Sequence, residues 1–264
     1  MSKKMLTKIG TALAIIAVVL PPLILGGIPI QILAAVIVFA SSYEIAGIKD
    51  ESKPRWALSF FIAAGTMILG IAPDSGLPMY ISIWVMLLFL LALFDEPFDC
   101  DQVTYTFAVS MIVVFAVHAV KRIYVSSFGW EGMLFVVLAT FVCDTAAYFC
   151  GSFFGKHKMI PRVSPNKTWE GAVGGYIAGA AVSMIFGLYV SRTLPSDLVI
   201  TGALILPAVA EVGDLAFSLI KRRWGLKDFG SLFPGHGGVL DRVDSLLFCL
   251  MVFNALMIFK GVGV

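Results

Sequence analysis

The segment 218–244 lies between two long apolar stretches and contains the residue types needed for phosphate and metal chemistry. Charged residues make up only 14% of the sequence, so their concentration in one segment indicates a function. Asp228, Asp241 and Asp244 offer hard oxygen ligands of the kind that hold Mg²⁺. The segment also contains the cations Lys221, Arg222, Arg223 and Lys227, and the glycines Gly235, Gly237 and Gly238 around His236. Because glycine lets backbone N–H groups approach an anion closely, the segment predicts a site for a polyphosphate and a metal.

A second set of ionisable residues lies inside apolar stretches, where an unpaired charge is costly. Asp144 has no cation near it in the sequence, so it pairs either with a metal or with a distant residue. Its alternative role is a hydrogen bond between packed helices. Glu211, Asp214, Ser218 and Lys221 follow the spacing i, i+3, i+7, i+10, which places them on one helix face. We expect this face to turn towards the protein interior or a wet cavity.

Asp241 and Asp244 are also three residues apart, near the start of the last apolar stretch. The helix dipole alone favours a carboxylate at a helix N-terminus. That explanation accounts for one of the two aspartates, but hardly for both alongside Asp144 and Asp214. We therefore expect the four aspartates to act together.

A second basic loop, residues 155–171, precedes another apolar stretch. Lys167 and Thr168 are similar to the end of a phosphate-binding loop, but the preceding glycine of that motif is absent. Ser164-Pro165 fits a helix N-cap followed by proline in the first turn. Alternatively, Lys167 and Thr168 lie at the helix N-terminus, where an anion binds readily. The loop alone does not separate a topology anchor from a phosphate site.

Composition places these segments in a membrane protein. Hydrophobic residues make up 59% of the sequence and the mean hydropathy is +0.94, outside the range of ordinary soluble domains. Apolar stretches long enough to cross a bilayer recur along the chain. We predict an all-α, polytopic integral membrane protein with about nine transmembrane helices, eight or ten being the alternatives. The predicted spans are 10–26, 29–47, 56–72, 78–94, 103–121, 131–151, 171–191, 197–220 and 243–260.

The basic residues predict the orientation of these spans, because loops rich in Lys and Arg stay in the cytoplasm. With nine spans, only four of the 19 basic residues fall on the side opposite the N-terminus: Lys121, Arg122, Arg192 and Lys260. We therefore expect a cytoplasmic N-terminus, an inner-membrane location and an active site that faces the cytoplasm. The net charge of +2 is explained by topology, and no nucleic-acid partner is expected.

The cysteines do not indicate a metal site. Cys100, Cys143, Cys150 and Cys249 show neither CxxC spacing nor a Cys/His pattern, so we expect buried thiols rather than zinc ligands or disulfides.

The basic residues before the first apolar stretch could belong to a signal peptide. Because further spans follow at once, we interpret that stretch as the first span.

The charged segments together resemble those of phosphatidate cytidylyltransferases, also called CDP-diacylglycerol synthases. The resemblance covers about residues 144–245 and is most specific in the long C-terminal signature. The matching patterns are Asp144-x-x-x-Tyr148-x-x-Gly151, Gly155-Lys156, Ser164-Pro165-x-Lys167-Thr168-x-Glu170-Gly171, Gly213-Asp214, Ser218-x-x-Lys221-Arg222, Lys227-Asp228 and Pro234-Gly-His-Gly-Gly238-x-x-Asp241-Arg242-x-Asp244.

This resemblance implies a reaction in which phosphatidate and CTP give CDP-diacylglycerol and pyrophosphate with Mg²⁺. It implies that residues 126–264 form the catalytic part and residues 1–125 supply the other spans. The expected metal ligands are Asp144, Asp214, Asp241 and Asp244, and Lys221 joins them as a catalytic residue. The expected substrate-binding residues are Lys167, Thr168, Ser218, Arg222, Lys227, His236, Gly237, Gly238 and Arg242. His236 either contacts a phosphate or supports the glycine loop, and Ser218 bonds its neighbours rather than acting as a nucleophile.

Other functions account for fewer of these residues. A CTP-dependent polyprenol kinase would also use a lipid acceptor, but would leave CDP. An ion-coupled transporter could use Asp144, Glu211 and Asp214 as a relay, but it leaves the glycine-rich loop without a role. The glycine-rich stretch Gly171–Gly187 favours a homodimer, although the same pattern also suits packing within one chain.

Overall fold

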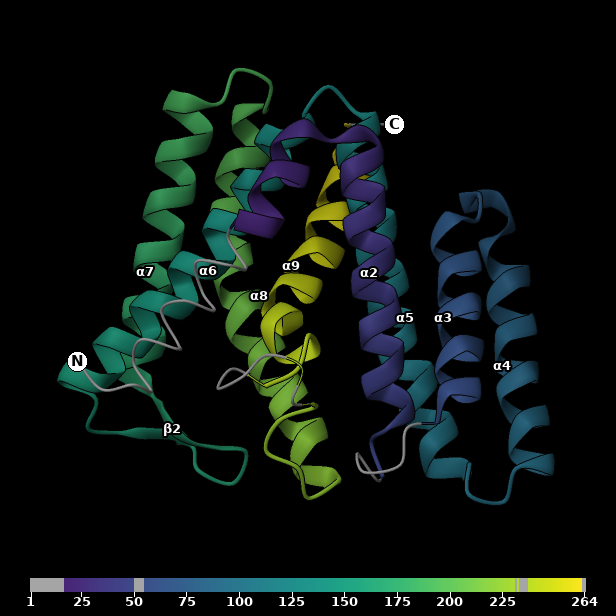
Figure 1. Ribbon diagram of the computed structural model, residues 1–264. Helices are drawn as coiled ribbons and strands as arrows, with labels where there is room; N and C mark the ends of the chain where they lie inside the picture. Colours follow the sequence, from purple (N-terminus) through teal and green to yellow (C-terminus); the bar gives the residue numbers. More distant parts are fainter. Residues whose placement is uncertain (1–16, 50–54, 231, 233–236, 263–264) are drawn as a thin grey trace.

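The chain folds into a bundle of long helices with one short β-hairpin (Figure 1). The computed structural model describes residues 17–49, 55–230, 232 and 237–262. The elements are α2 (Gly27–Ala46), α3 (Trp56–Ile71), the 3-10 turn η1 (Asp74–Gly76), α4 (Leu77–Phe94), α5 (Cys100–Val125), α6 (Gly129–Phe154), β1 (Lys158–Ile160), β2 (Ser164–Thr168), α7 (Trp169–Ile185), the π-helical turn η2 (Phe186–Val190), α8 (Ser196–Arg223) and α9 (Leu240–Phe259).

Seven helical segments in the described ranges are long and apolar enough to cross a membrane. Helix α3 is also apolar but has only 16 residues. Each of these elements matches one of the last eight predicted spans to within a few residues. The first predicted span, 10–26, lies mostly outside the described residues, and only residues 17–25 are seen as helix. The chain is thus an α-helical, multi-pass membrane protein, and the count of nine stays a prediction.

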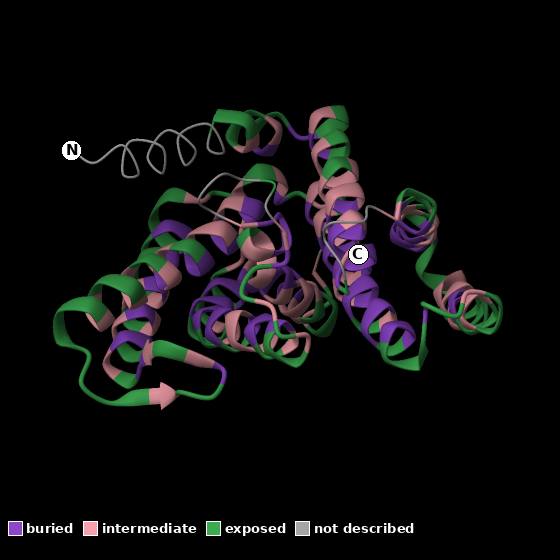
Figure 2. Cartoon of the chain, turned by 60° about the horizontal axis from the view of Figure 1, so that its bottom comes forward, coloured by how far each residue is buried: buried purple, intermediate pink, exposed green. Residues whose placement is uncertain are grey.

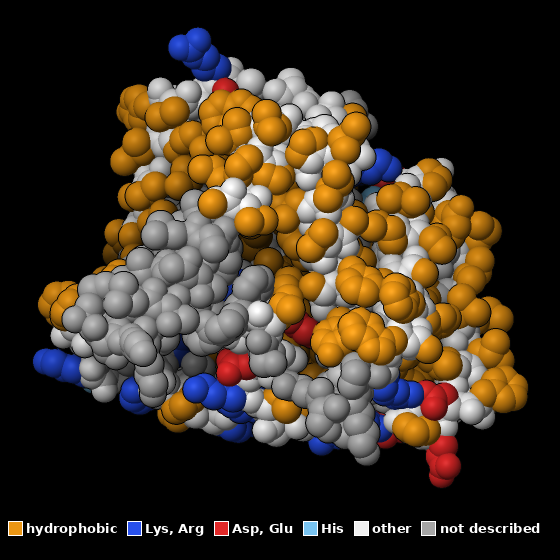
Figure 3. Space-filling model, viewed as in Figure 1, with side chains coloured by type: hydrophobic (Ala, Val, Ile, Leu, Met, Phe, Trp, Pro, Cys, Tyr) orange, Lys and Arg blue, Asp and Glu red, His pale blue; other side chains and the backbone are white. Residues whose placement is uncertain are grey.

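Successive helices run in opposite directions, so alternate connections share one end of the bundle (Figure 1). The C-terminal ends of α2, α4, α6 and α8 lie at the lower end, beside the N-terminal ends of α3, α5, α7 and α9. Figure 3 shows most of the visible Lys and Arg side chains along this lower margin, below a surface of apolar side chains. Both charged segments singled out in the sequence therefore lie at the same, basic end.

Helix α5 is the most buried of the spans, and α4 the least. Figure 2 shows exposed residues along the periphery of the bundle and buried residues on its interior faces. On α4, Met86, Leu93 and Phe94 are exposed although they are apolar. A peripheral helix with such an outer surface is suited to contact with lipid chains.

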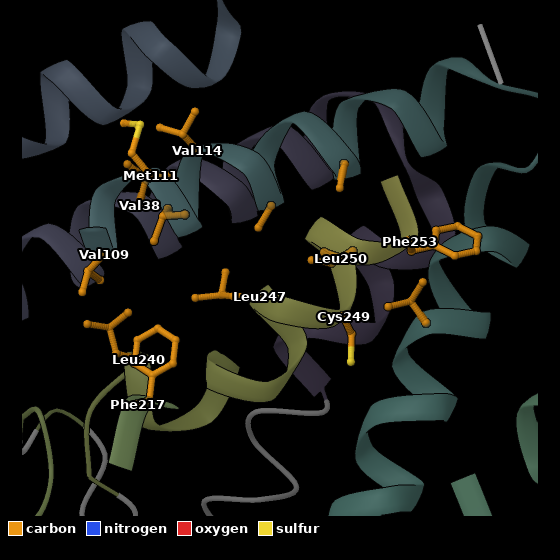
Figure 4. Close-up of a cluster of buried hydrophobic side chains, with 14 of the residues drawn as sticks. Val38, Val109, Met111, Val114, Phe217, Leu240, Leu247, Cys249, Leu250 and Phe253 are labelled. Atoms are coloured by element: carbon orange, nitrogen blue, oxygen red, sulfur yellow. The ribbon is translucent and has the colours of Figure 1, made fainter. Parts of the chain in front are cut away.

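The interior joins the N-terminal and C-terminal halves of the chain (Figure 4). Buried side chains from four helices form one cluster: Val38 of α2, Val109, Met111 and Val114 of α5, Phe217 of α8, and Leu240, Leu247, Leu250 and Phe253 of α9. Helix α9 therefore packs against the first half of the chain as well as against α8. This packing fixes the helix that carries Asp241 and Asp244.

The glycines of α7 are used for packing within the chain. Gly171, Gly175 and Gly179 recur every four residues and face α6. A Cβ atom on these three residues would lie 2.8, 2.6 and 2.8 Å from the backbone oxygens of Ala147, Cys143 and Ala139 respectively. Small residues at this spacing let two helices approach closely in a membrane. The surface formed by these three glycines is therefore covered by α6. The expected homodimer stays a prediction, and these glycines do not support it.

The substitution Gly175→Ala tests this packing. The new methyl group would lie 2.6 Å from the Cys143 carbonyl oxygen, which belongs to helix backbone and cannot move aside easily. We expect a loss of about 1–3 kcal/mol of stability, because overpacking forces the helices apart. The measurement is the thermal unfolding midpoint in detergent. Gly47→Ala is the control, because its new Cβ would meet the nearest atom at 3.5 Å. Equal midpoints for the two variants would contradict the close contact between α6 and α7.

Candidate active site

A polar cavity of about 620 Å³ lies at the basic end of the bundle. It is formed by the C-terminal ends of α6 and α8, the N-terminal ends of α7 and α9, and strand β2. Its charged lining residues are Asp144, Lys167, Glu211, Asp214, Lys221, Asp228, Asp241, Arg242 and Asp244. Tyr148 also lines the cavity and is 70% exposed, so the cavity reaches the surface along α6. The structure thus brings all four predicted aspartates to one place.

Lys167 crosses the cavity from the end of β2 to α8. Its Nζ atom lies 2.7 Å from Glu211 Oε2 and 2.7 Å from Asp214 Oδ2. It also donates a hydrogen bond to the Glu211 backbone oxygen at 3.2 Å. One lysine therefore balances two carboxylates on the polar face of α8, which turns inward as the residue spacing predicts.

The loop before α7 differs from one expectation. Ser164-Pro165 does not cap a helix, because both residues belong to β2, which pairs with β1 in a hairpin. The cap of α7 is Thr168, whose hydroxyl oxygen accepts a hydrogen bond from the Gly171 N–H at 3.2 Å. Lys167 and Thr168 therefore do lie at a helix N-terminus, and Thr168 also lines the cavity.

Lys221 and Asp241 form a buried ion pair, with 2.7 Å between Nζ and Oδ1. Their side chains are 10% and 3% exposed. The other oxygen of Asp241 accepts hydrogen bonds from the Phe229 N–H at 2.7 Å and the Gly238 N–H at 2.9 Å. Both oxygens of Asp241 thus bind groups of the protein itself, one the Lys221 ammonium and the other two backbone N–H groups. Asp241 therefore links α8, α9 and the loop between them.

Asp144 and Asp244 also line the cavity. Ser245 lies between them: its hydroxyl is 3.5 Å from Asp144 Oδ1, and its N–H donates to Asp244 Oδ1 at 2.8 Å. In the part of the chain that the structure describes, the ion pairs of this cavity involve Glu211, Asp214 and Asp241, and none involves Asp144 or Asp244. These two carboxylates therefore supply negative charge that a bound cation could balance.

The donor types suit Mg²⁺, although the described residues include no group of three or more His, Cys, Asp or Glu side chains placed to hold a metal ion. Mg²⁺ usually binds one or two carboxylates together with substrate phosphates and water, rather than a complete protein cage. Asp144 and Asp244 meet that requirement, and Asp214 would join them from the same cavity. The residues present therefore fit a metal that arrives with a phosphate ligand.

Five predicted substrate-binding residues in the described ranges do not line the cavity: Ser218, Arg222, Lys227, Gly237 and Gly238. Ser218 is buried on the inner face of α8. Arg222 donates from Nε to the Val163 carbonyl at 3.2 Å, so it holds the hairpin. Lys227 is exposed. His236 lies outside the described residues.

The glycines of the signature enclose protein carboxylates. Gly237 has φ +83°, a conformation that favours glycine, and a Cβ there would lie 2.9 Å from Asp241 Oδ2. Gly238 donates to that same oxygen. The Gly238 N–H therefore donates to a carboxylate of the chain itself, and binding of a substrate phosphate by these glycines stays a prediction.

One further carboxylate at this end, that of Glu44 on α2, was not singled out in the sequence. It is 4% exposed and accepts hydrogen bonds from the Val239 and Leu240 N–H groups. The available signal was an acidic residue within a predicted span, 29–47, the same signal that marks Asp144.

A multi-pass membrane bundle whose basic end holds a cavity lined by lysines and aspartates has the features of a membrane enzyme that acts on phosphates. The sequence model of a protein family, described as the cytidylyltransferase family, matches residues 6–259 of this chain. The chain belongs to the cytidylyltransferase family and is therefore a nucleotidyltransferase.

Individual relatives agree with this assignment. Phosphatidate cytidylyltransferase of Staphylococcus saprophyticus is 33% identical over 267 residues, which cover 95% of this chain and 99% of the relative. The protein of that name from Staphylococcus aureus strain COL is 32% identical over 270 residues, with the same coverage. That from Haemophilus influenzae is 44% identical over 126 residues, which cover 46% of this chain and 44% of the relative.

Proposed function

We propose that this protein transfers CMP from CTP to phosphatidate, giving CDP-diacylglycerol and pyrophosphate. The observation that carries the proposal is the charged cavity at the basic end of a membrane bundle, in a chain related over 95% of its length to proteins named phosphatidate cytidylyltransferase. A site at this depth lets a lipid present its phosphate while its acyl chains stay in the bilayer.

The chemistry requires positioning more than a strong base. A phosphate monoester has a second pKa of about 6, so phosphatidate is already a nucleophilic anion at neutral pH. One of its phosphate oxygens attacks the α-phosphorus of CTP, and the bond from that phosphorus to the β-phosphate oxygen breaks. Pyrophosphate leaves with the electron pair. The obstacle is repulsion between two polyanions, which fixed cations relieve.

Lys167, Lys221 and Arg242 are the cations that line the cavity. We assign to them the neutralisation of the triphosphate and of the lipid phosphate. Lys167 and Lys221 already pair with carboxylates of the cavity, which hold their ammonium groups in place. Asp144 and Asp244, with Asp214, would hold Mg²⁺. When bound, Mg²⁺ would neutralise phosphate charge near the leaving group.

An acceptor assay tests the proposed function. Purified protein in detergent receives CTP, Mg²⁺ and one lipid, and pyrophosphate and lipid-bound cytidine are measured. We expect both products in equal amounts with phosphatidate and neither with diacylglycerol, which lacks the attacking phosphate. CDP together with a newly phosphorylated lipid would instead indicate a kinase. Uptake of an ion into vesicles without nucleotide turnover would indicate a transporter.

The orientation of the site gives a separate prediction. Cys100 is exposed, contrary to the expectation that the cysteines are buried. It lies at the start of α5, at the same end of the bundle as the cavity (Figure 1). If that end faces the cytoplasm, a membrane-impermeant maleimide should label Cys100 in inside-out vesicles and not in right-side-out vesicles. Cys100→Ser is the control that assigns the label. Labelling from the outer face would reverse the proposed orientation.

A further inference from the structure

Helix α9 carries Asp241 and Asp244 but has no side-chain cap of its own. Its N-cap residue is Val239, which offers no polar side-chain atom. The first N–H groups of the helix are instead satisfied by Glu44, near the C-terminal end of α2. Glu44 Oε1 accepts from the Val239 N–H at 2.6 Å, and Oε2 accepts from the Leu240 N–H at 2.8 Å. A residue of the N-terminal half thus caps the helix that carries the signature.

The loop before α9 is shaped around this carboxylate. A Cβ atom on Gly238 would lie 2.4 Å from Glu44 Oε1, and one on Gly230 would lie 3.1 Å from the same oxygen. Gly238 does not have a positive φ, so its backbone conformation would accept alanine. The obstacle to a side chain at Gly238 is therefore the Glu44 carboxylate itself.

Two carboxylates, one earlier and one later in the sequence, accept hydrogen bonds from the backbone of this short stretch. Glu44 binds the N–H groups of Val239 and Leu240, and Asp241 binds the N–H of Gly238. Bonds from N–H groups to a carboxylate at a helix N-terminus are strong, because the charge and the helix dipole add. Glu44 is 4% exposed, so its removal would leave buried N–H groups without an acceptor.

We propose that Glu44 is a positioning residue for the transfer reaction, which fixes the start of α9 and thereby directs Asp241 and Asp244 into the cavity. This inference rests on the proposed function. Glu44 is not among the described residues that line the cavity, so it acts through α9 and not on the substrates. We therefore expect it to control kcat more than the KM for CTP.

The first test is Glu44→Gln, which keeps the size of the side chain and removes its charge. A misplacement of about 1 Å at a reacting group can cost up to about 100-fold in rate. We expect a fall in kcat of roughly that size with little change in KM. We also expect faster hydrogen exchange at the amides of residues 237–243, a readout that does not depend on activity.

Asp99→Asn is the matched control, because Asp99 caps another helix at the same end. Its Oδ1 accepts from the Gln102 N–H at 3.0 Å, at the start of α5. A hydrogen bond from Lys49 holds the pKa of Asp99 below its usual value, so Asp99→Asn removes a charge at neutral pH. Asp99 does not line the cavity, and we expect kcat to be unchanged in Asp99→Asn.

A double-mutant cycle adds a variant that keeps Glu44. Gly238→Ala should lower kcat in the wild-type background, because the new methyl group displaces the carboxylate. In the Glu44→Ala background it should cost nothing further, since the atoms it would meet are gone. Additive losses, or a wild-type kcat and exchange rate in Glu44→Gln, would overturn the role of Glu44.

Wild-type protein is assayed alongside these variants. A wild type without pyrophosphate release counts against the proposed function, whereas an active wild type with an unaltered Glu44→Gln counts against Glu44 alone.

Discussion

Asp214→Asn should lower kcat by roughly 10²–10³-fold, the size of effect seen when one preorganised electrostatic group is removed from an active site. This corresponds to about 3–4 kcal/mol of transition-state stabilisation. Asp214 lines the cavity and holds Lys167 at 2.7 Å. Asparagine has nearly the same shape but no charge, so it weakens both the hold on Lys167 and the proposed binding of Mg²⁺. The measurement is initial-rate kinetics of pyrophosphate release with saturating CTP and phosphatidate.

The matched control for this substitution is Asp197→Asn on the same helix. Asp197 lies at the opposite end of α8, where it is exposed and pairs with Lys260 at 2.9 Å. The two variants make the same chemical change in the same helix and differ in their distance from the cavity. We expect Asp197→Asn to retain wild-type kcat. Near-normal turnover in Asp214→Asn would remove Asp214 from the proposed metal and cation site.

Lys221→Ala should abolish most activity and also destabilise the protein. Its partner Asp241 has a side chain that is only 3% exposed, so the substitution leaves a buried charge without its cation. Breaking a buried ion pair in this way costs roughly 3–5 kcal/mol. The expected results are a lower thermal unfolding midpoint in detergent and a loss of pyrophosphate release. The control is Arg223→Ala, which breaks an exposed pair with Asp101 and should cost no more than about 1 kcal/mol.

A paired substitution separates the two effects of Lys221. Lys221→Met with Asp241→Asn removes both charges, and the amide oxygen can still accept the Phe229 and Gly238 N–H groups. Neutral replacement of a buried ion pair is often tolerated. We therefore expect the unfolding midpoint to recover and the activity to stay low. Recovery of activity would show that Lys221 serves stability alone.

The sequence predicted the helices well because the bilayer sets their length. The spans predicted at 131–151 and 197–220 correspond to α6 and α8, which run from 129 to 154 and from 196 to 223. It also predicted that Asp144, Asp214, Asp241 and Asp244 meet, since a carboxylate in or beside an apolar helix must turn inward. The end of the bundle at which they meet follows from the alternation of helix direction.

Two features depended on contacts that spacing does not encode. The Ser164-Pro165 pair has the residue types of a helix cap, but backbone pairing of β2 with β1 moves the cap to Thr168. Glu44 lies at the end of an apolar stretch, where an acidic residue usually faces water. Its partners, the Val239 and Leu240 N–H groups, are nearly 200 residues away and are backbone groups. No residue pattern could identify them.

The most direct test of the proposed transfer follows the phosphorus atoms of CTP. Wild-type protein is supplied with phosphatidate, Mg²⁺ and CTP labelled either at the α- or at the γ-phosphate. The proposed reaction predicts that the α-label enters the lipid in equal amount to the pyrophosphate released, and that the γ-label appears only in pyrophosphate. Transfer of the γ-label to the lipid, with the α-label left in CDP, would contradict cytidylyl transfer and would indicate a kinase.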